Sequence, residues 1–299
     1  MNSSDPATIR EVMEKAAPII REIEAKRGTR MVVLFCYAAL DTVTVYKLNK
    51  ILRRMGPIEN LDILIESGGG DIDAAVKLIK TAKAYAKKDS AVVPFYAKSA
   101  ASLIALSADD IVMCKAGELG PIDPQVRDPL TKQWIPAHSI TEALRFIEEC
   151  HDVNVKLSLA DKLPVMTIGA YRDSQQASEQ YLEEAFAWMG DKKAKAIETF
   201  AEKFLSHGYP IDRNQCMDVG LKVVTPDSEL EGKLCDLHEL YTDMALSVAN
   251  RPDDGEADIL LIQGDGQRCV VFGVEDISSQ IFTPPAAAST EALQKIIKP

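Results

Sequence analysis

Short runs of consecutive apolar residues alternate with amphipathic segments through about the first 115 residues of the chain. Such short runs are typical of strands that are buried on both faces of a sheet. The segments between them carry apolar residues at helical spacing. The pattern predicts strands over residues 31–37, 61–66, 91–96 and 111–114, and helices over residues 5–26, 41–55, 71–86 and 99–108. This alternation predicts an α/β fold built from parallel βαβ units.

The pattern changes after residue 120. Four prolines between residues 121 and 136 predict a surface loop. Helical spacing then predicts a helical layer or arm, with helices over residues 140–161, 167–189 and 191–205. The pattern breaks over residues 206–210, and one more short helix is predicted over residues 212–220. After a charged stretch, two apolar runs around a Gly-Asp-Gly turn predict a hairpin over residues 257–274. We expect residues 1–249 to form one domain with its core at about 30–225, and residues 250–299 to form a hairpin and tail that could serve in assembly.

The composition narrows the class of protein. The formal net charge of −11 argues against nucleic acid or an anionic membrane as the main partner, since both require a basic surface. No run of about twenty apolar residues is present and the first residues lack the features of a signal peptide, so we expect no membrane span. The six cysteines are scattered without a CxxC pair, which favours a cytoplasmic protein without disulfides or a structural metal. Neither a P-loop nor a dinucleotide-binding glycine pattern is present, and no cofactor is expected.

Three glycines, Gly68, Gly69 and Gly70, follow one residue after the second predicted strand. Glycine permits a sharp turn whose N–H groups stay unobstructed, and such groups can stabilise an oxyanion. A plain tight turn is the alternative interpretation.

About thirty residues later, Ser99 stands between a predicted buried strand and an apolar helix. This position lies at the carboxyl end of the sheet, where α/β proteins keep their sites. Ser99 could be a helix N-cap. If it belongs to one site with the glycines, Ser99 would be a nucleophile, and the N–H groups of Gly69 or Gly70 and of Ala100 would form the oxyanion hole.

These features together resemble the ClpP/signal-peptide-peptidase superfamily of serine peptidases, and more closely the serine dehydrogenase proteinase family. Members of that family carry Gly-Pro-(Ile/Val)-Asp-Pro-Gln and His-x-Tyr-Pro-Ile motifs in this order. This chain has Gly-Pro-Ile-Asp-Pro-Gln over residues 120–125 and His-Gly-Tyr-Pro-Ile over residues 207–211. The resemblance covers about residues 30–225. It implies a ClpP/crotonase-like fold and a serine endopeptidase that acts without ATP on peptides or unfolded segments. It also implies a homo-oligomer, based on trimers or rings.

The resemblance further implies a catalytic triad. Carried onto the matching positions, the nucleophile is Ser99, the acid is Asp123 and the base is His207. A serine hydroxyl is a poor nucleophile until a neutral imidazole takes its proton, and a carboxylate fixes the imidazole tautomer.

Several alternatives stay open. Ser102 is a rival nucleophile, because Ala-Ala-Ser-Leu over residues 100–103 is similar to the Ala-Ala-Ser-Met of ClpP. A Ser-Lys dyad, as in signal-peptide peptidases, would use Lys156 or Lys162 as its base. The chain also departs from the family pattern, with Gly68 in place of proline and two alanines in place of the two glycines after the nucleophile. The competing functions are a catalytically inactive oligomeric binding protein with the same fold, and a crotonase-type acyl-CoA enzyme.

Overall fold

The computed structural model of the protein describes residues 6–127, 134–161, 165–204, 206–249, 259–264 and 267–272. The chain divides into two compact units. The first, which we call the sheet unit, comprises Met1–Leu119 and Pro210–Pro299, and the second, the helical unit, comprises Gly120–Tyr209.

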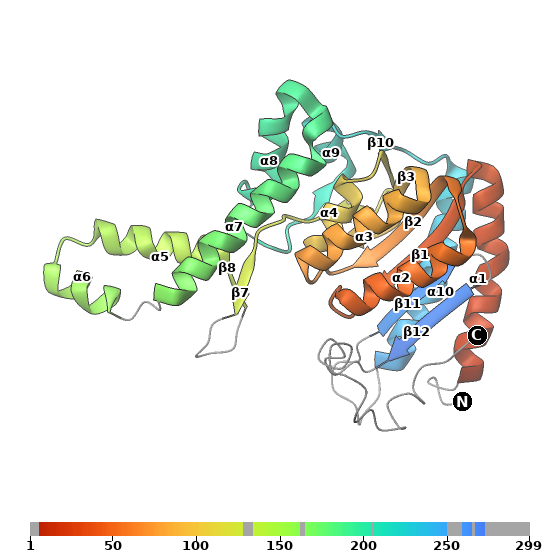
Figure 1. Ribbon diagram of the computed structural model, residues 1–299, viewed down its shortest axis with the longest axis horizontal. Helices are drawn as coiled ribbons and strands as arrows, with labels where there is room; N and C mark the ends of the chain where they lie inside the picture. The colour runs from red at the N-terminus through yellow and green to blue at the C-terminus, as the bar shows by residue number, and fades with distance from the viewer. Residues whose placement is uncertain are drawn as a thin grey trace. The chain divides into compact units, whose positions relative to one another are not determined.

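The sheet unit is built on one large, mostly parallel sheet (Figure 1). The strands run in the order β10-β5-β3-β2-β1-β11-β12, and β4, β6 and β9 extend the sheet beyond the end of β2. Its strands are β1 (Arg30–Cys36), β2 (Ile58–Ser67), β3 (Ala86–Val93), β4 (Tyr96–Ala97), β5 (Asp110–Met113), β6 (Glu118–Leu119), β9 (Ile211–Asp212), β10 (Val223–Val224), β11 (Ile259–Gly264) and β12 (Gln267–Phe272). The parallel pairs β1–β2, β2–β3 and β3–β5 confirm the predicted α/β class.

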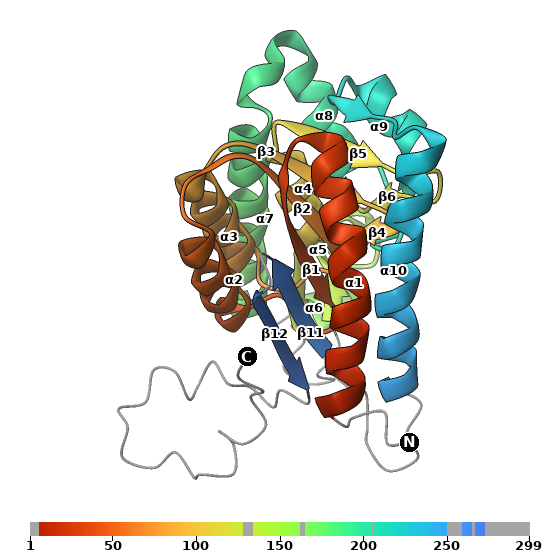
Figure 2. The same cartoon turned by 90° about the vertical axis from the view of Figure 1, so that its right-hand side faces the viewer.

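Helices cover both faces of this sheet. They are α1 (Pro6–Arg27), α2 (Thr42–Met55), α3 (Ile72–Tyr85), α4 (Ala100–Leu106), α9 (Arg213–Val219) and α10 (Ser228–Ala249). Figure 2 shows α1 and α10 side by side on one face and α2 and α3 on the other. Side chains of α1 and α10, including Ile23 and Tyr241, pack with Phe35 and Leu64 of the strands in one buried cluster. The strands read as continuous apolar runs because both of their faces are covered.

The sequence pattern predicts the third strand too late in the chain. It predicts a strand over residues 91–96, whereas β3 begins at Ala86 and ends at Val93. Lys87 and Lys88 are exposed at its start, so this part of the strand carries the polar pattern of a helix end. Pro94 has no N–H to donate to a ladder, and strand pairing resumes only at Tyr96.

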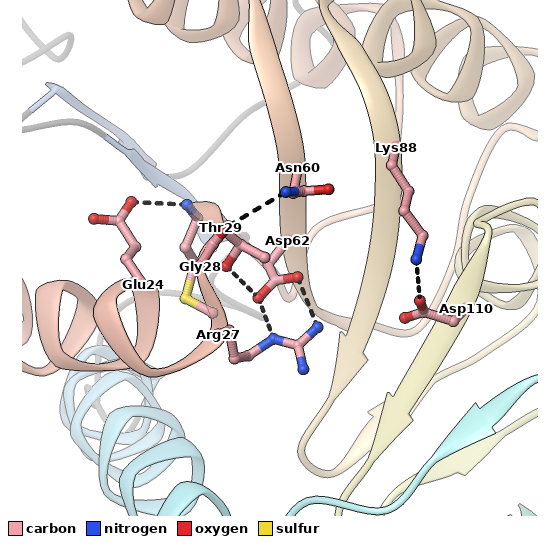
Figure 3. A network of polar contacts seen from close by, with 9 residues as sticks. Glu24, Arg27, Gly28, Thr29, Asn60, Asp62, Lys88 and Asp110 are labelled. Carbon is pink, nitrogen blue, oxygen red and sulfur yellow. Dashed lines mark hydrogen bonds and ion pairs between the residues drawn. The ribbon is translucent and has the colours of Figure 1, made fainter.

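A buried carboxylate fixes the end of α1 to the central strand (Figure 3). Asp62 of β2 accepts hydrogen bonds from Nε and Nη2 of Arg27, at 2.5 and 3.0 Å. Thr29 Oγ1 donates to the same carboxylate at 2.8 Å. A buried charge is costly unless its oxygens are paired, and here both oxygens of Asp62 are.

The hairpin predicted over residues 257–274 is present as β11 and β12, whose six residue pairs are antiparallel. The hairpin continues the central sheet, because β11 pairs antiparallel with β1 from Val32↔Gly264 to Cys36↔Leu260. Gln263 of β11 accepts from the Tyr241 hydroxyl and donates to the carbonyl of Met13, so the hairpin also contacts α10 and α1. The predicted charged stretch over residues 250–256, the turn at 265–266 and the tail after 272 lie outside the described residues.

The helical unit contains the predicted arm with altered boundaries. Its elements are β7 (Gln125–Arg127), β8 (Trp134–Pro136), α5 (Ala137–Glu149), α6 (Val153–Ala160), α7 (Val165–Ala185), the 3-10 helix η1 (Ala187–Lys192) and α8 (Lys193–Ala201). The proline-rich segment predicted as a loop therefore contains two short paired strands. The single helix predicted over residues 140–161 is wrong, because the Asp152 side chain accepts from the N–H groups of Asn154 and Val155 and so caps a new helix. Phe186 and Phe200 pack at 5.9 Å in the core of this unit.

None of the helices in the described ranges is long and apolar enough to cross a membrane.

Candidate active site

Ser99 occupies a strained turn between β4 and α4. Its backbone has φ 51° and ψ −123°, and it is the one non-glycine residue with positive φ in the part of the chain that the structure describes. Such a conformation costs about 1–3 kcal/mol and is typical of functional sites, including nucleophiles on strand-to-helix turns. The Ser99 side chain makes no capping hydrogen bond to α4. Ser99 therefore occupies the N-cap position of α4, but its side chain does not cap the helix.

The glycine turn lies directly against Ser99 within the sheet unit. Gly69 and Gly70 have φ angles of 107° and 148°. A Cβ at Gly69 would lie 2.8 Å from Cβ of Ser99, and a Cβ at Gly70 would lie 2.2 Å from the nitrogen of Leu40. Only glycine satisfies both the backbone conformation and the close approach at these two positions.

The backbone N–H groups of this turn differ in their hydrogen bonding. The N–H of Gly69 donates to Ser67 Oγ at 3.1 Å. Within the described ranges, the N–H groups of Gly70 and Ala100 have no hydrogen-bond acceptor. Two glycines were proposed from the sequence as donors. The N–H of Gly69 is already used by Ser67, so the role of Gly69 is to leave room for Ser99.

The structure accommodates both departures from the family motif in this turn. Ala100 and Ala101, which replace two glycines, are buried. Their methyl groups therefore pack in the core. Gly68 replaces a proline, and a Cβ built on it meets no atom within 4 Å.

Asp123 and His207 form a hydrogen-bonded pair within the helical unit. His207 Nδ1 lies 2.5 Å from Asp123 Oδ1, and the two side chains are only 25% and 12% exposed. A ring N–H that donates to the carboxylate from Nδ1 leaves the Nε2 lone pair available to accept a proton.

Local contacts hold both partners of this pair. The N–H of Ile122, next to Asp123, donates to the carbonyl of Phe200 at 2.7 Å. The turn that carries His207 is closed by the Tyr209 N–H, which donates to the Ser206 carbonyl at 3.0 Å. The rings of Phe204 and Tyr209 stack across this turn with centroids 3.8 Å apart.

The rival residues have less suitable surroundings. Ser102 is fully buried in α4 and its hydroxyl donates to the carbonyl of Ala97 at 2.6 Å. Lys156 lies on α6, which has no buried residue, and its Nζ donates to the carbonyl of Glu148. A lysine base has to be desolvated to lose its charge near neutral pH, and within a single subunit α6 offers no such burial. Lys162 lies outside the described residues.

Sequence reasoning missed two charged side chains beside this turn. Lys98, immediately before Ser99, contacts Glu118 of β6 at 2.6 Å and donates to the carbonyl of Leu119 at 3.2 Å. Glu66, two residues before Gly68, is buried at 1% exposure. A charged residue inside an apolar strand was the available signal for Glu66.

Comparison with known proteins identifies the family to which the chain belongs. The family model of ClpP-like SDH-type serine proteinases matches residues 5–250. Two Methanocaldococcus jannaschii proteins, the uncharacterized proteins MJ1495 and MJ0137, are 32% and 30% identical to this chain. The alignments cover 74% and 75% of this chain, and 75% and 77% of those relatives.

Two solved structures give weaker matches. A serine-to-alanine mutant of the 1510-N membrane-bound stomatin-specific protease is 15% identical, with a TM-score of 0.45, over 69% of this chain and 84% of that one. ClpP1 from Listeria monocytogenes is 14% identical, with a TM-score of 0.41, over 68% of this chain and 95% of that one.

Proposed function

The chain belongs to the family of ClpP-like SDH-type serine proteinases, and from this premise we propose that it hydrolyses peptide bonds through an acyl-enzyme on Ser99. The observation that carries the proposal is the strained turn of Ser99, which packs against Gly69 and makes no side-chain capping hydrogen bond. In the part of the chain that the structure describes, the nearby N–H groups of Gly70 and Ala100 have no acceptor. An N–H group aimed at a developing oxyanion stabilises the transition state by about 3 kcal/mol. The N–H groups of Gly70 and Ala100 are the donors we assign to this role.

The Asp123–His207 pair is the base in this proposal. His207 Nε2 takes the proton of the Ser99 hydroxyl while Oγ attacks the scissile carbonyl carbon. The same imidazole then gives the proton to the leaving amine as the C–N bond breaks. Water attacks the acyl-enzyme by the reverse sequence and releases the new carboxylate. Asp123 holds the tautomer through the 2.5 Å contact at Nδ1 and stabilises the imidazolium.

A fluorophosphonate probe tests the nucleophile directly. We expect the wild-type protein to gain one covalent adduct at Ser99, located by peptide mass spectrometry. Ser99→Ala should abolish the adduct, whereas Ser102→Ala should retain it. Peptidase activity on a fluorescent unfolded protein, without ATP, should be lost together with the label.

Other outcomes favour the competing functions. A folded wild-type protein that takes no label but binds peptides would support the inactive binding protein. Label that persists in Ser99→Ala would refute the assignment of the nucleophile.

We also propose that the chain acts as a homo-oligomer. In support, α5 and α6 present exposed apolar side chains, with Phe146 65%, Val153 66% and Leu157 63% exposed. Exposed apolar patches are typical of interaction sites. Light scattering should give a mass that is a multiple of 32.8 kDa, and Leu157→Lys should lower it. A monomeric mass at micromolar concentration would refute this proposal.

A further inference from the structure

Two buried carboxylates lie on the same face of β2, at different positions along the strand. Asp62 and Glu66 are four residues apart, and both side chains are no more than 1% exposed. Asp62 uses both oxygens on Arg27 and Thr29, as Figure 3 shows. Glu66 uses only Oε2, and its buried Oε1 has no hydrogen-bond partner in the described part of the chain. Burial of a half-paired carboxylate is costly to the fold, and a functional role would explain why it is present.

Glu66 lies where the ladder between neighbouring strands is interrupted. β2 pairs with β3 up to Leu64↔Val92, and then with β4 at Ser67↔Ala97. Between these pairs, the N–H of Tyr96 donates to Oε2 of Glu66 at 3.2 Å. The carboxylate thus takes the place of a backbone carbonyl at the start of β4. Two residues further on, backbone pairing resumes, and the Lys98 N–H donates to the Ser67 carbonyl at 2.9 Å.

The surroundings of Glu66 connect it to α10. His238 of α10 places Nε2 3.2 Å from Oε2 of Glu66. The His238 ring also lies 5.5 Å from the ring of Phe95, the residue before β4. Burial raises the pKa of Tyr37 and of Tyr96, and the negative charge of Glu66 raises both further.

We propose that Glu66 is a positioning residue for the proposed peptidase reaction, with His238 as its partner on α10. Its carboxylate holds the start of β4 against the end of β2, and so holds Ser99 beside the N–H groups of the glycine turn. The inference rests on the proposed function, because Ser99 and these N–H groups are the reacting parts. It assigns to α10 a contribution to the site, although no residue of α10 touches the substrate in this proposal.

The test compares Glu66→Leu, Glu66→Gln and Asp62→Asn in the full chain. We expect Glu66→Leu to slow fluorophosphonate labelling of Ser99 and to lower kcat by about 10- to 100-fold, since a displacement of about 1 Å has this effect. KM should change less than about threefold. Glu66→Gln keeps an oxygen acceptor for the Tyr96 N–H and should restore both rates to within about threefold of wild type.

Asp62→Asn is the matched control. It alters a buried carboxylate on the same strand and face, and should lower the melting temperature while leaving the labelling rate per folded molecule unchanged. If Glu66→Leu does not fold, His238→Phe replaces it, because this change keeps an aromatic ring on Phe95 and removes only the ring nitrogens. We expect His238→Phe to slow labelling by about three- to tenfold, since Glu66 loses one of its two polar partners.

Three results would overturn the inference: wild-type rates in folded Glu66→Leu or His238→Phe, an equal loss of rate in Asp62→Asn, or a Glu66→Gln protein as slow as Glu66→Leu. Labelling of the wild-type protein at Ser99 tests the proposed function separately. Only the ratio of variant to wild-type rates tests Glu66.

Discussion

Gly70→Ala should remove most of the activity without unfolding the protein. The new Cβ would lie 2.2 Å from the nitrogen and 2.5 Å from the oxygen of Leu40. Neither atom can move freely, because the Leu40 N–H donates to the Gly69 carbonyl and the Leu40 carbonyl accepts from the Asp71 N–H, both at 2.8 Å. Ordinary contact needs about 3.5 Å. The turn at residue 70 must therefore shift by about 1 Å.

That shift determines the size of the effect. It moves the Gly70 N–H away from the position proposed for the oxyanion, and the loss of one such donor costs about 3 kcal/mol, or roughly 100- to 1,000-fold in kcat. KM should stay within about threefold, because the donor acts mainly in the transition state.

Gly68→Ala is the control for this measurement. A Cβ at Gly68, two residues earlier in the same turn, meets nothing within 4 Å. We expect its kcat on a peptide substrate, and its rate of labelling at Ser99, to stay within about twofold of wild type. The reasoning is refuted if folded Gly70→Ala keeps kcat within threefold, or if both glycine variants lose activity equally.

Three further outcomes follow from the structure. Asp123→Asn should lower kcat by about a thousandfold or more, because the tautomer of His207 is no longer fixed; a loss below tenfold in steady-state assays would contradict the triad. Burial raises the pKa of Asp89 from 3.8 to about 6, with the charge of Asp109 adding to it, so the carboxylate destabilises the fold as pH rises from about 4 through 6. Asp89→Asn should therefore raise the free energy of unfolding by about 2–3 kcal/mol at pH 7.5 and by little at pH 3.5 in urea titrations, and an equal effect at both pH values would exclude this cause. Lys156→Met should leave the labelling rate unchanged, and a loss above tenfold would restore the Ser-Lys dyad.

Local patterns predicted the parallel core of the sheet unit well. β1 and β2 are buried on both faces, and their apolar runs in the sequence are unambiguous. The turn of Ser99 could be placed for the same reason, since it lies between such a strand and an apolar helix. The pairing of Asp123 with His207 followed from two motifs and not from any periodicity.

Long-range strand pairing and local helix capping were harder to predict from the sequence. The hairpin of β11 and β12 has a local signal, but the pairing of β11 with β1 joins residues more than 220 positions apart. The break before α6 depends on a single side chain, Asp152, within an otherwise helical pattern. The contact of Glu66 with Tyr96 depends on where β3 ends, and that end was predicted too late in the chain.

The late position of β11 has a consequence for biosynthesis. Until the ribosome has delivered residues 259–264, the apolar strand β1 has a neighbour on one side only. An unpaired, hydrophobic edge of this kind recruits other strands and leads to aggregation. One edge of β1 thus stays unpaired through most of the synthesis of the protein. A chain that stops before residue 259 should therefore accumulate as insoluble material.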